Sequence, residues 1–115
     1  MSKTTHGITL VTVGEETFEL KPTLKAVRGI EARFGGIGPA IGELNQLKTS
    51  AIAAVLLIGS GKDFKPKDIE ALEEKVFEAG IAEINPQVIP YVVALLNPGG
   101  KSKDELEAEA AKGNE

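Results

Sequence analysis

The densest set of side chains that could do acid–base chemistry is a run of four glutamates: Glu70, Glu73, Glu74 and Glu78. Two carboxylates can act as general acid and general base when a pocket holds them in different environments. Here Ile69, Leu72 and Val76 recur between them at helical spacing, which predicts that the glutamates cover the outer face of a helix. We interpret the run as a solvated face that could present acidic surface to a basic partner.

Composition restricts most other chemistry. The chain has one histidine, His6, and no cysteine, so a zinc site, a disulfide framework and a Cys–His pair all lack the residues they need. The sequence GSGK at residues 59–62 looks like part of a phosphate-binding loop. Its glycine spacing is wrong, however, and Asp63 follows the lysine where Ser or Thr is required. We therefore predict that the chain is not an enzyme and has no catalytic residues, cofactor or metal.

The charge pattern argues against nucleic acid as a partner. The formal net charge is −4, and the basic residues are scattered except for Lys62, Lys65 and Lys67. Nucleic-acid-binding domains usually gather their basic residues on one face, so we interpret this group as a solvated loop. The apolar runs at 51–58 and 88–96 are too short to span a bilayer, which argues against a membrane protein.

The first part of the chain reads as a β-hairpin. Residues 8–13 alternate between two faces, with Ile8 and Leu10 on one and Thr9, Val11 and Val13 on the other. Residues 14–16 form a short loop, and residues 17–20 form the return strand. Pro22 ends that strand because it cannot donate a ladder hydrogen bond.

Five helices are predicted after the hairpin, from caps and apolar spacing. The first begins at Leu24 with Thr23 as its N-cap and stops at Gly35, and the second covers 39–47. The third covers 51–58, capped by Thr49 or Ser50. The fourth begins at Pro66 and ends at Gly80. The fifth begins at Pro86, with Asn85 as its N-cap, and ends at about Leu96.

These elements predict an α+β fold, in which an N-terminal β-hairpin packs on a small bundle of four to five α-helices. Residues 1–100 form a single globular domain. Residues 101–115 are charged and contain one large apolar side chain, Leu106, so we expect a frayed or helical tail. With 115 residues the domain can build a real core, but not a large one.

The third and fifth predicted helices are apolar on nearly every side. A small hairpin and three amphipathic helices can cover only part of them, so some of their surface is expected to be exposed and to contact protein. The alternative is that the two helices pack on one another at the centre of the domain. If their surface does contact protein, the candidate contact residues are Leu57, Ile58, Val92, Val93, Leu95 and Leu96.

Two short motifs, LKPT at 20–23 and IEARFG at 30–35, are followed by an Ala/Leu-rich helix and an acidic helix that ends in glycine. In these features, residues 6–97 resemble the tail assembly chaperone family of long-tailed phages, in the branch found in gene transfer agents and related prophages. The glycine-rich linker after residue 35 and the last helix, which is less rich in alanine, depart from the family pattern.

The resemblance implies a non-catalytic role in building a phage-type tail. Members of the family coat the long tape measure protein and help to recruit tail tube subunits, so these two proteins are the implied partners, and a homo-oligomer is expected. Two alternatives stay open: a structural tail tube or minor tail protein, and a small host protein-interaction adaptor. Residues 1–6 are polar and no apolar segment follows them, so no signal peptide is predicted. The expected location is the cytoplasm of the bacterial host, or the virion if the protein is structural.

Overall fold

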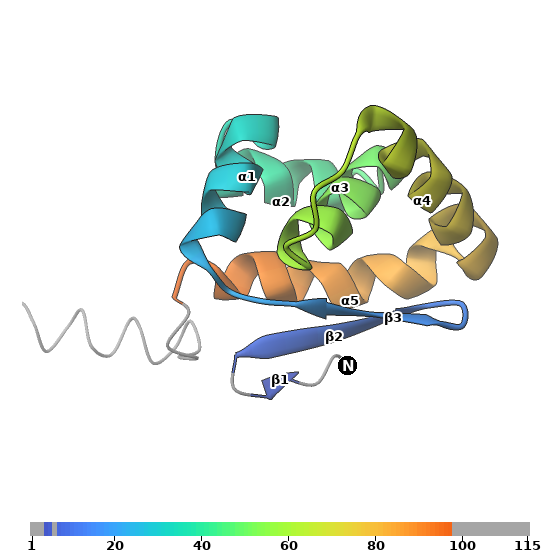
Figure 1. Cartoon of the computed structure of the whole chain (residues 1–115), viewed down its shortest axis with the longest axis horizontal. Helices are drawn as coiled ribbons and strands as arrows, with labels where there is room; N and C mark the ends of the chain where they lie inside the picture. Colours follow the sequence, from blue (N-terminus) through green and yellow to red (C-terminus); the bar gives the residue numbers. More distant parts are fainter. Residues whose placement is uncertain (1–3, 6, 98–115) are drawn as a thin grey trace, which may run out of the picture.

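The computed structural model describes residues 4, 5 and 7–97. Within these residues, a small antiparallel sheet is covered on one face by helices, as Figure 1 shows. The predicted α+β class is confirmed. The predicted tail at 101–115 lies outside the described residues.

The sheet contains strands β1 (Thr4–Thr5), β2 (Ile8–Val13) and β3 (Glu16–Leu20), in that order. Val13 pairs with Glu16 across a two-residue turn, in which Gly14 has a φ of +62°. The predicted hairpin is confirmed, with the return strand starting one residue earlier than expected. Strand β1 was not predicted. Of the two faces of β2, the one that carries Thr9, Val11 and Val13 is buried.

Helix α1 (Leu24–Phe34) has the predicted caps. The Thr23 hydroxyl accepts a hydrogen bond from the Ala26 N–H at 3.1 Å, and Gly35 ends the helix with a φ of +91°. Helix α2 (Ile37–Asn45) begins two residues before the predicted start at Pro39, so this proline lies in its first turn, where a missing N–H costs little.

Helix α3 (Thr49–Gly59) differs from the prediction at its start. Neither Thr49 nor Ser50 caps it, because both are already helical and Lys48 occupies the N-cap position. The Thr49 hydroxyl instead donates a hydrogen bond to the Glu73 carboxylate at 2.7 Å, which joins α3 to α4 (Pro66–Ala79). The predicted start of α4 at Pro66 and its end at Gly80 are confirmed.

Helix α5 (Ile81–Ala94) begins five residues before the predicted start at Pro86. Asn85 is not its N-cap but an interior residue, with only 4% of its surface exposed. Gly80, with a φ of +108°, separates α4 from α5. Pro86 and Pro90 both lie inside the helix, where each removes one backbone hydrogen bond.

The core lies where α5 meets the other elements: α5 contacts β2, α2, α3 and α4. Helix α3 is enclosed almost completely, and every residue from Ala51 to Gly59 except Leu57 is buried. The expectation that α3 leaves apolar surface exposed is therefore wrong for most of its length. No helix in the described part of the chain is long and apolar enough to cross a membrane.

Candidate functional site: the outer face of helix α5

One side of α5 carries a line of apolar residues that the fold leaves uncovered. The line consists of Ala82, Pro86, Ile89, Val93 and Leu96, and we call it the α5 strip. Successive members are four and three residues apart, a spacing that keeps them on one side of a helix. Ile89 is half-buried, and the other four members are exposed, Val93 by 44% and Leu96 by 62%.

Leu96 belongs to the strip although it lies just beyond the last α-helical residue. The chain continues in tight turns there, with the N–H of Leu96 donating to the carbonyl oxygen of Val93 at 3.1 Å. Pro90 is also exposed and lies next to the strip, between the turns that hold Pro86 and Val93.

Two polar contacts fix the rotation of α5 about its axis. The Tyr91 hydroxyl donates to the Lys21 carbonyl oxygen at 2.6 Å. The Gln87 amide accepts a hydrogen bond from the Thr12 N–H at 3.1 Å and donates to the Thr12 carbonyl oxygen at 3.4 Å. Gln87 bonds to strand β2, and Tyr91 bonds to the residue just after β3. The α5 strip lies on the opposite side of the helix from both anchors and therefore faces solvent.

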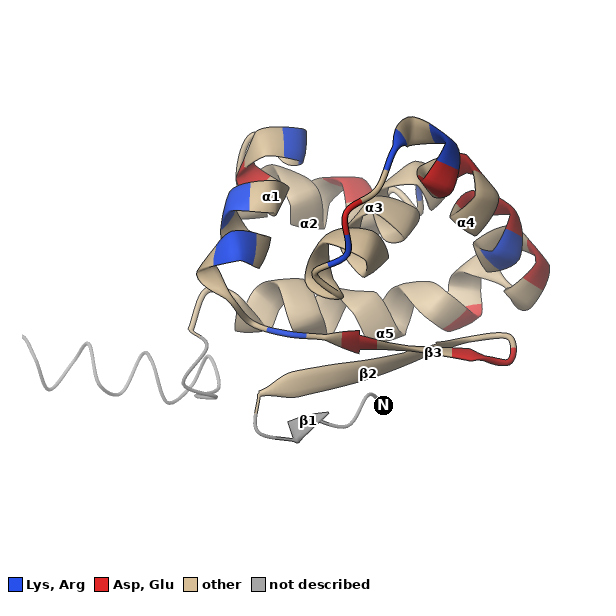
Figure 2. Ribbon diagram, viewed as in Figure 1, with Lys and Arg blue, Asp and Glu red and all other residues tan. Residues whose placement is uncertain are grey.

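The α5 strip is almost free of charge. Glu83 is the single charged residue of α5, and it appears as one acidic segment in an otherwise uncharged ribbon in Figure 2. Soluble proteins seldom leave a long apolar line without a partner, and such surfaces commonly mark contacts with other proteins.

The six residues predicted to contact protein fall in different places. Val93 and Leu96 lie on the α5 strip. Leu57 is half-buried, while Ile58, Val92 and Leu95 belong to the core and offer little or no surface to a partner in this conformation. The structure therefore does not bring the six together on one surface. Whether Val93 and Leu96 contact a partner stays a prediction.

Sequence reasoning missed Ala82, Pro86, Ile89 and Pro90 as members of this face. The cause was the misplaced helix start, which left Ala82 outside the helix and put Pro86 at its first position. Spacing alone could not have found them, because the buried residues Ile84, Val88, Tyr91 and Leu95 recur at the same alternating intervals of four and three residues.

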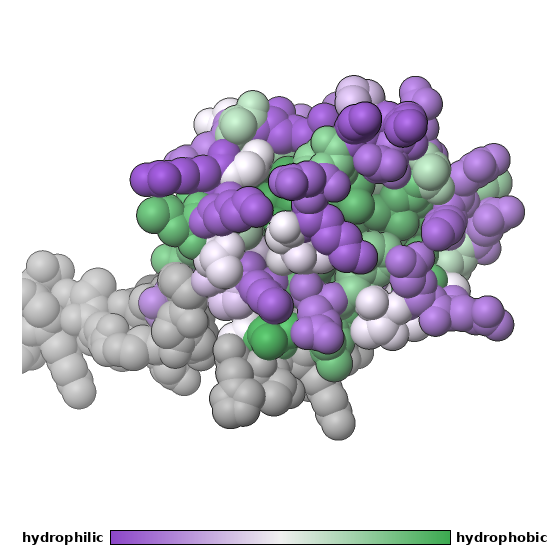
Figure 3. Space-filling model, in the orientation of Figure 1, coloured by the Kyte–Doolittle hydropathy of each residue, from purple (hydrophilic) through white to green (hydrophobic). Residues whose placement is uncertain are grey.

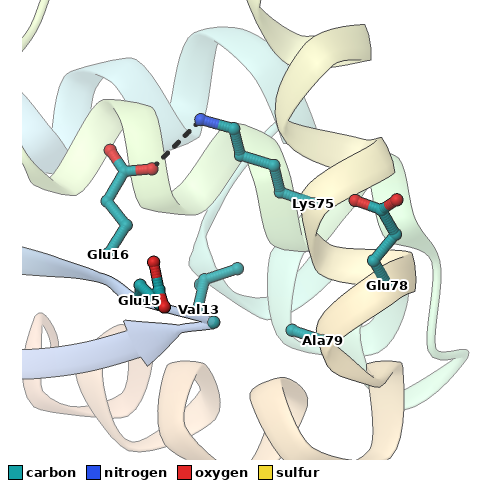
Figure 4. Close-up of a pocket in the computed structure, with 7 residues that line it drawn as sticks. Val13, Glu15, Glu16, Lys75, Glu78 and Ala79 are labelled. Atoms are coloured by element: carbon teal, nitrogen blue, oxygen red, sulfur yellow. Dashed lines mark hydrogen bonds and ion pairs between the residues drawn. The ribbon is translucent and has the colours of Figure 1, made fainter.

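A second candidate is a hollow of about 490 Å³ between the β2–β3 turn and α4. Figure 4 shows it lined by Val13, Glu15, Glu16, Lys75, Glu78 and Ala79, with the Lys75 ammonium 3.2 Å from a Glu16 carboxylate oxygen. Its charged side chains are all exposed to solvent. Acid–base catalysis needs carboxylates held in distinct environments, and this open hollow does not supply them.

A second hollow, of about 320 Å³, adjoins the α3–α4 connection and includes Leu57. Phe18, Phe64 and Leu72 give it an apolar floor, and the Lys62 ammonium lies 5.9 Å from the centre of the Phe18 ring. In Figure 3, apolar surface is visible between hydrophilic residues on this side of the molecule.

Within residues 4, 5 and 7–97, no group of three or more His, Cys, Asp or Glu side chains is placed to hold a metal ion. Comparisons of the chain with protein-family models, curated proteins and solved structures find no match.

Proposed function

We propose that this chain is a non-enzymatic assembly chaperone for a phage-type tail, which binds the tape measure protein and helps to recruit tail tube subunits. The observation that carries the proposal is the α5 strip: an exposed apolar face, three to four helical turns long, on a helix anchored firmly to the sheet. The resemblance of residues 6–97 to tail assembly chaperones supports the same function.

The α5 strip matches the surface that an amphipathic helix presents. Apolar residues spaced alternately by four and three residues pack against a similar line on a partner helix, with knobs from one side filling holes on the other. Tape measure proteins are long and helical, and before assembly their apolar faces are exposed to water. A chaperone that covers such faces acts by mass action, since binding lowers the concentration of the free, aggregating form.

The test is coexpression with the tape measure protein encoded in the same tail gene cluster. The wild-type chain should keep that protein in the soluble fraction, and Leu96→Glu should abolish the protection while leaving the thermal unfolding midpoint unchanged. The matched control is Phe77→Glu, because Phe77 is 69% exposed but lies on α4. It should protect as well as the wild-type chain.

Three results would count against the proposal. The first is full protection by Leu96→Glu, which would remove the α5 strip from the mechanism. The second is an equal loss of protection in Phe77→Glu, which would indicate that any added negative charge on the surface has this effect. The third is this chain in purified tail particles at the copy number of a tube subunit, which would favour the structural alternative.

A further inference from the structure

The α5 strip contains an uncommon feature for a helix surface: two of its backbone carbonyl groups have lost their usual donors. In an α-helix each N–H bonds to the carbonyl oxygen four residues before it. Pro86 and Pro90 have no N–H, so the carbonyl oxygens of Ala82 and Pro86 receive no such bond. Both carbonyl groups belong to residues of the α5 strip.

These two carbonyl groups belong to exposed residues, on the side of α5 that faces water in the free protein. Ala82, Pro86 and Pro90 are all exposed. The nearby Gln87 amide donates instead to the carbonyl oxygens of Glu83, at 3.0 Å, and Thr12. A partner that covers the strip displaces this water, and a carbonyl group left without a donor in a dry interface costs affinity.

The side chains of the strip cannot supply the missing donors. Alanine, proline, isoleucine, valine and leucine have no donor atoms, so a second copy of α5 packed on the strip would leave the carbonyl groups unpaired. The charge of the chain also disfavours a second copy as the partner, because α5 carries Glu83 and no basic residue, and the whole chain has a net charge of −4. The complementary partner is apolar, donates hydrogen bonds and is positively charged.

We propose that the α5 strip selects an amphipathic helix that carries a lysine or arginine among its central apolar contact residues. This inference rests on the proposed function and adds a chemical rule for the client segment. The ammonium or guanidinium group donates to the carbonyl oxygens of Ala82 and Pro86 with Glu83 alongside, while flanking leucines and alanines cover Val93 and Leu96. A homo-oligomer, if the chain forms one, uses a different surface.

The test uses two synthetic helical peptides of about three heptads, with leucine and alanine at the contact positions. They are identical except that one central contact residue is lysine in the first and norleucine in the second. Binding to the full chain is measured by fluorescence anisotropy. Because hydrogen bonds to charged donors are the stronger kind, the lysine peptide should bind about tenfold more tightly.

The double variant Pro86→Ala/Pro90→Ala restores both N–H donors within the helix and should reduce the preference for lysine to less than about twofold, because the two carbonyl groups are then already paired. Circular dichroism and thermal unfolding confirm that the variant is folded. Glu83→Gln is the second comparison, and it should keep most of the preference. If Glu83→Gln alone removes the preference, simple charge attraction explains it and the role of the carbonyl groups is overturned.

The remaining outcomes separate this inference from the proposed function. If both peptides bind the wild-type chain equally, the rule for lysine is wrong while the strip still binds helices. An unchanged preference in the double proline variant also overturns the rule. If neither peptide binds and the coexpressed tape measure protein still aggregates, both proposals fail.

Discussion

Tyr91 and Lys21 are joined by a hydrogen bond of 2.6 Å, from the tyrosine hydroxyl on α5 to a backbone carbonyl oxygen just after β3. The two residues are 70 positions apart, so this bond ties the last described helix to the strand that precedes the first helix. The Tyr91 ring is fully buried and also lies against α3 at Gly59. One side chain therefore links the sheet, α3 and α5, and it fixes the direction in which the α5 strip faces.

Replacing Tyr91 with phenylalanine should destabilise the chain by about 1–2 kcal/mol, because the ring still fills its space but the Lys21 carbonyl group loses its donor. Urea unfolding followed by circular dichroism measures the change. The slope of the transition should stay the same, since the surface exposed on unfolding is unchanged. An unaltered midpoint would mean that water replaces the hydroxyl at no cost.

Stability should also fall at high pH through the same residue. Burial raises the pKa of Tyr91 well above its usual value of about 10. Between these two pKa values the unfolded chain releases the phenolic proton and the folded chain keeps it. The free energy that this group contributes to folding is therefore fully present below about pH 10, and it decreases as the pH rises towards the pKa of Tyr91 in the folded chain.

The measurement is urea unfolding from pH 8 to 11.5, on the wild-type chain and on Tyr91→Phe. Lysine titration contributes to both proteins in this range, so the tyrosine effect is the difference between the two curves. Because Tyr91 is the only tyrosine, its absorbance at about 295 nm reports its ionisation directly. A folded-state titration near pH 10 would contradict the raised pKa.

Gly59 is predicted to resist the substitution that usually stabilises a helix. A Cβ atom at Gly59 would lie 2.9 Å from Cε2 of Tyr91 and 3.0 Å from Cδ2 of Leu20, too close for either neighbour. We expect Gly59→Ala to cost about 1–3 kcal/mol, since α3 must shift away from the Tyr91 ring. Thermal unfolding measures the loss.

Gly42 provides the matched control, because it lies inside α2 and a Cβ atom at this position would meet nothing within 4 Å. Gly42→Ala should stabilise the chain by up to about 1 kcal/mol, through the greater helix propensity of alanine. Equal effects of the two substitutions would show that the packing of Gly59 against Tyr91 is looser than described.

The sequence predicted local structure well where one signal dominated. The Thr23 cap, the Gly35 stop and the hairpin turn at Gly14 each depend on a few neighbouring residues, and each was correct. The pair Asn85-Pro86 gave an equally clear local signal for a helix start, but the structure overrides it. Burial of Ile84 against the core favours a helical conformation for this turn. It outweighs the missing hydrogen bond at Pro86 and the buried Asn85 Oδ1, which has no hydrogen-bond partner among the described residues.

The candidate site could be predicted only in part, for a geometric reason. Helices that are apolar on every side give no periodicity from which to infer the buried side. Val92 and Val93 are chemically identical neighbours, and the first is buried and the second exposed because of how α5 packs on the other elements, which includes the anchors at Tyr91 and Gln87. Strand β1 was missed for a related reason, because two threonines show no alternation.

The exposed direction of α5 can be tested with this same pair of valines. Val92→Glu places a carboxylate at a position with no exposed surface and should destabilise the chain by about 3 kcal/mol or more. Val93→Glu changes a side chain that is 44% exposed and should alter stability by less than about 0.5 kcal/mol. Urea unfolding of both variants gives the two values.

The two substitutions are chemically identical and one residue apart, so helix propensity and added charge cancel in the comparison. What remains is the direction that each side chain faces. If Val93→Glu costs as much as Val92→Glu, residue 93 is inside the fold and the α5 strip does not exist as a surface. The other outcome is a Val93→Glu variant that is folded and stable but no longer protects the tape measure protein. In that case the contact lies on the outer face of α5, because the substitution changes that face and leaves the core unchanged.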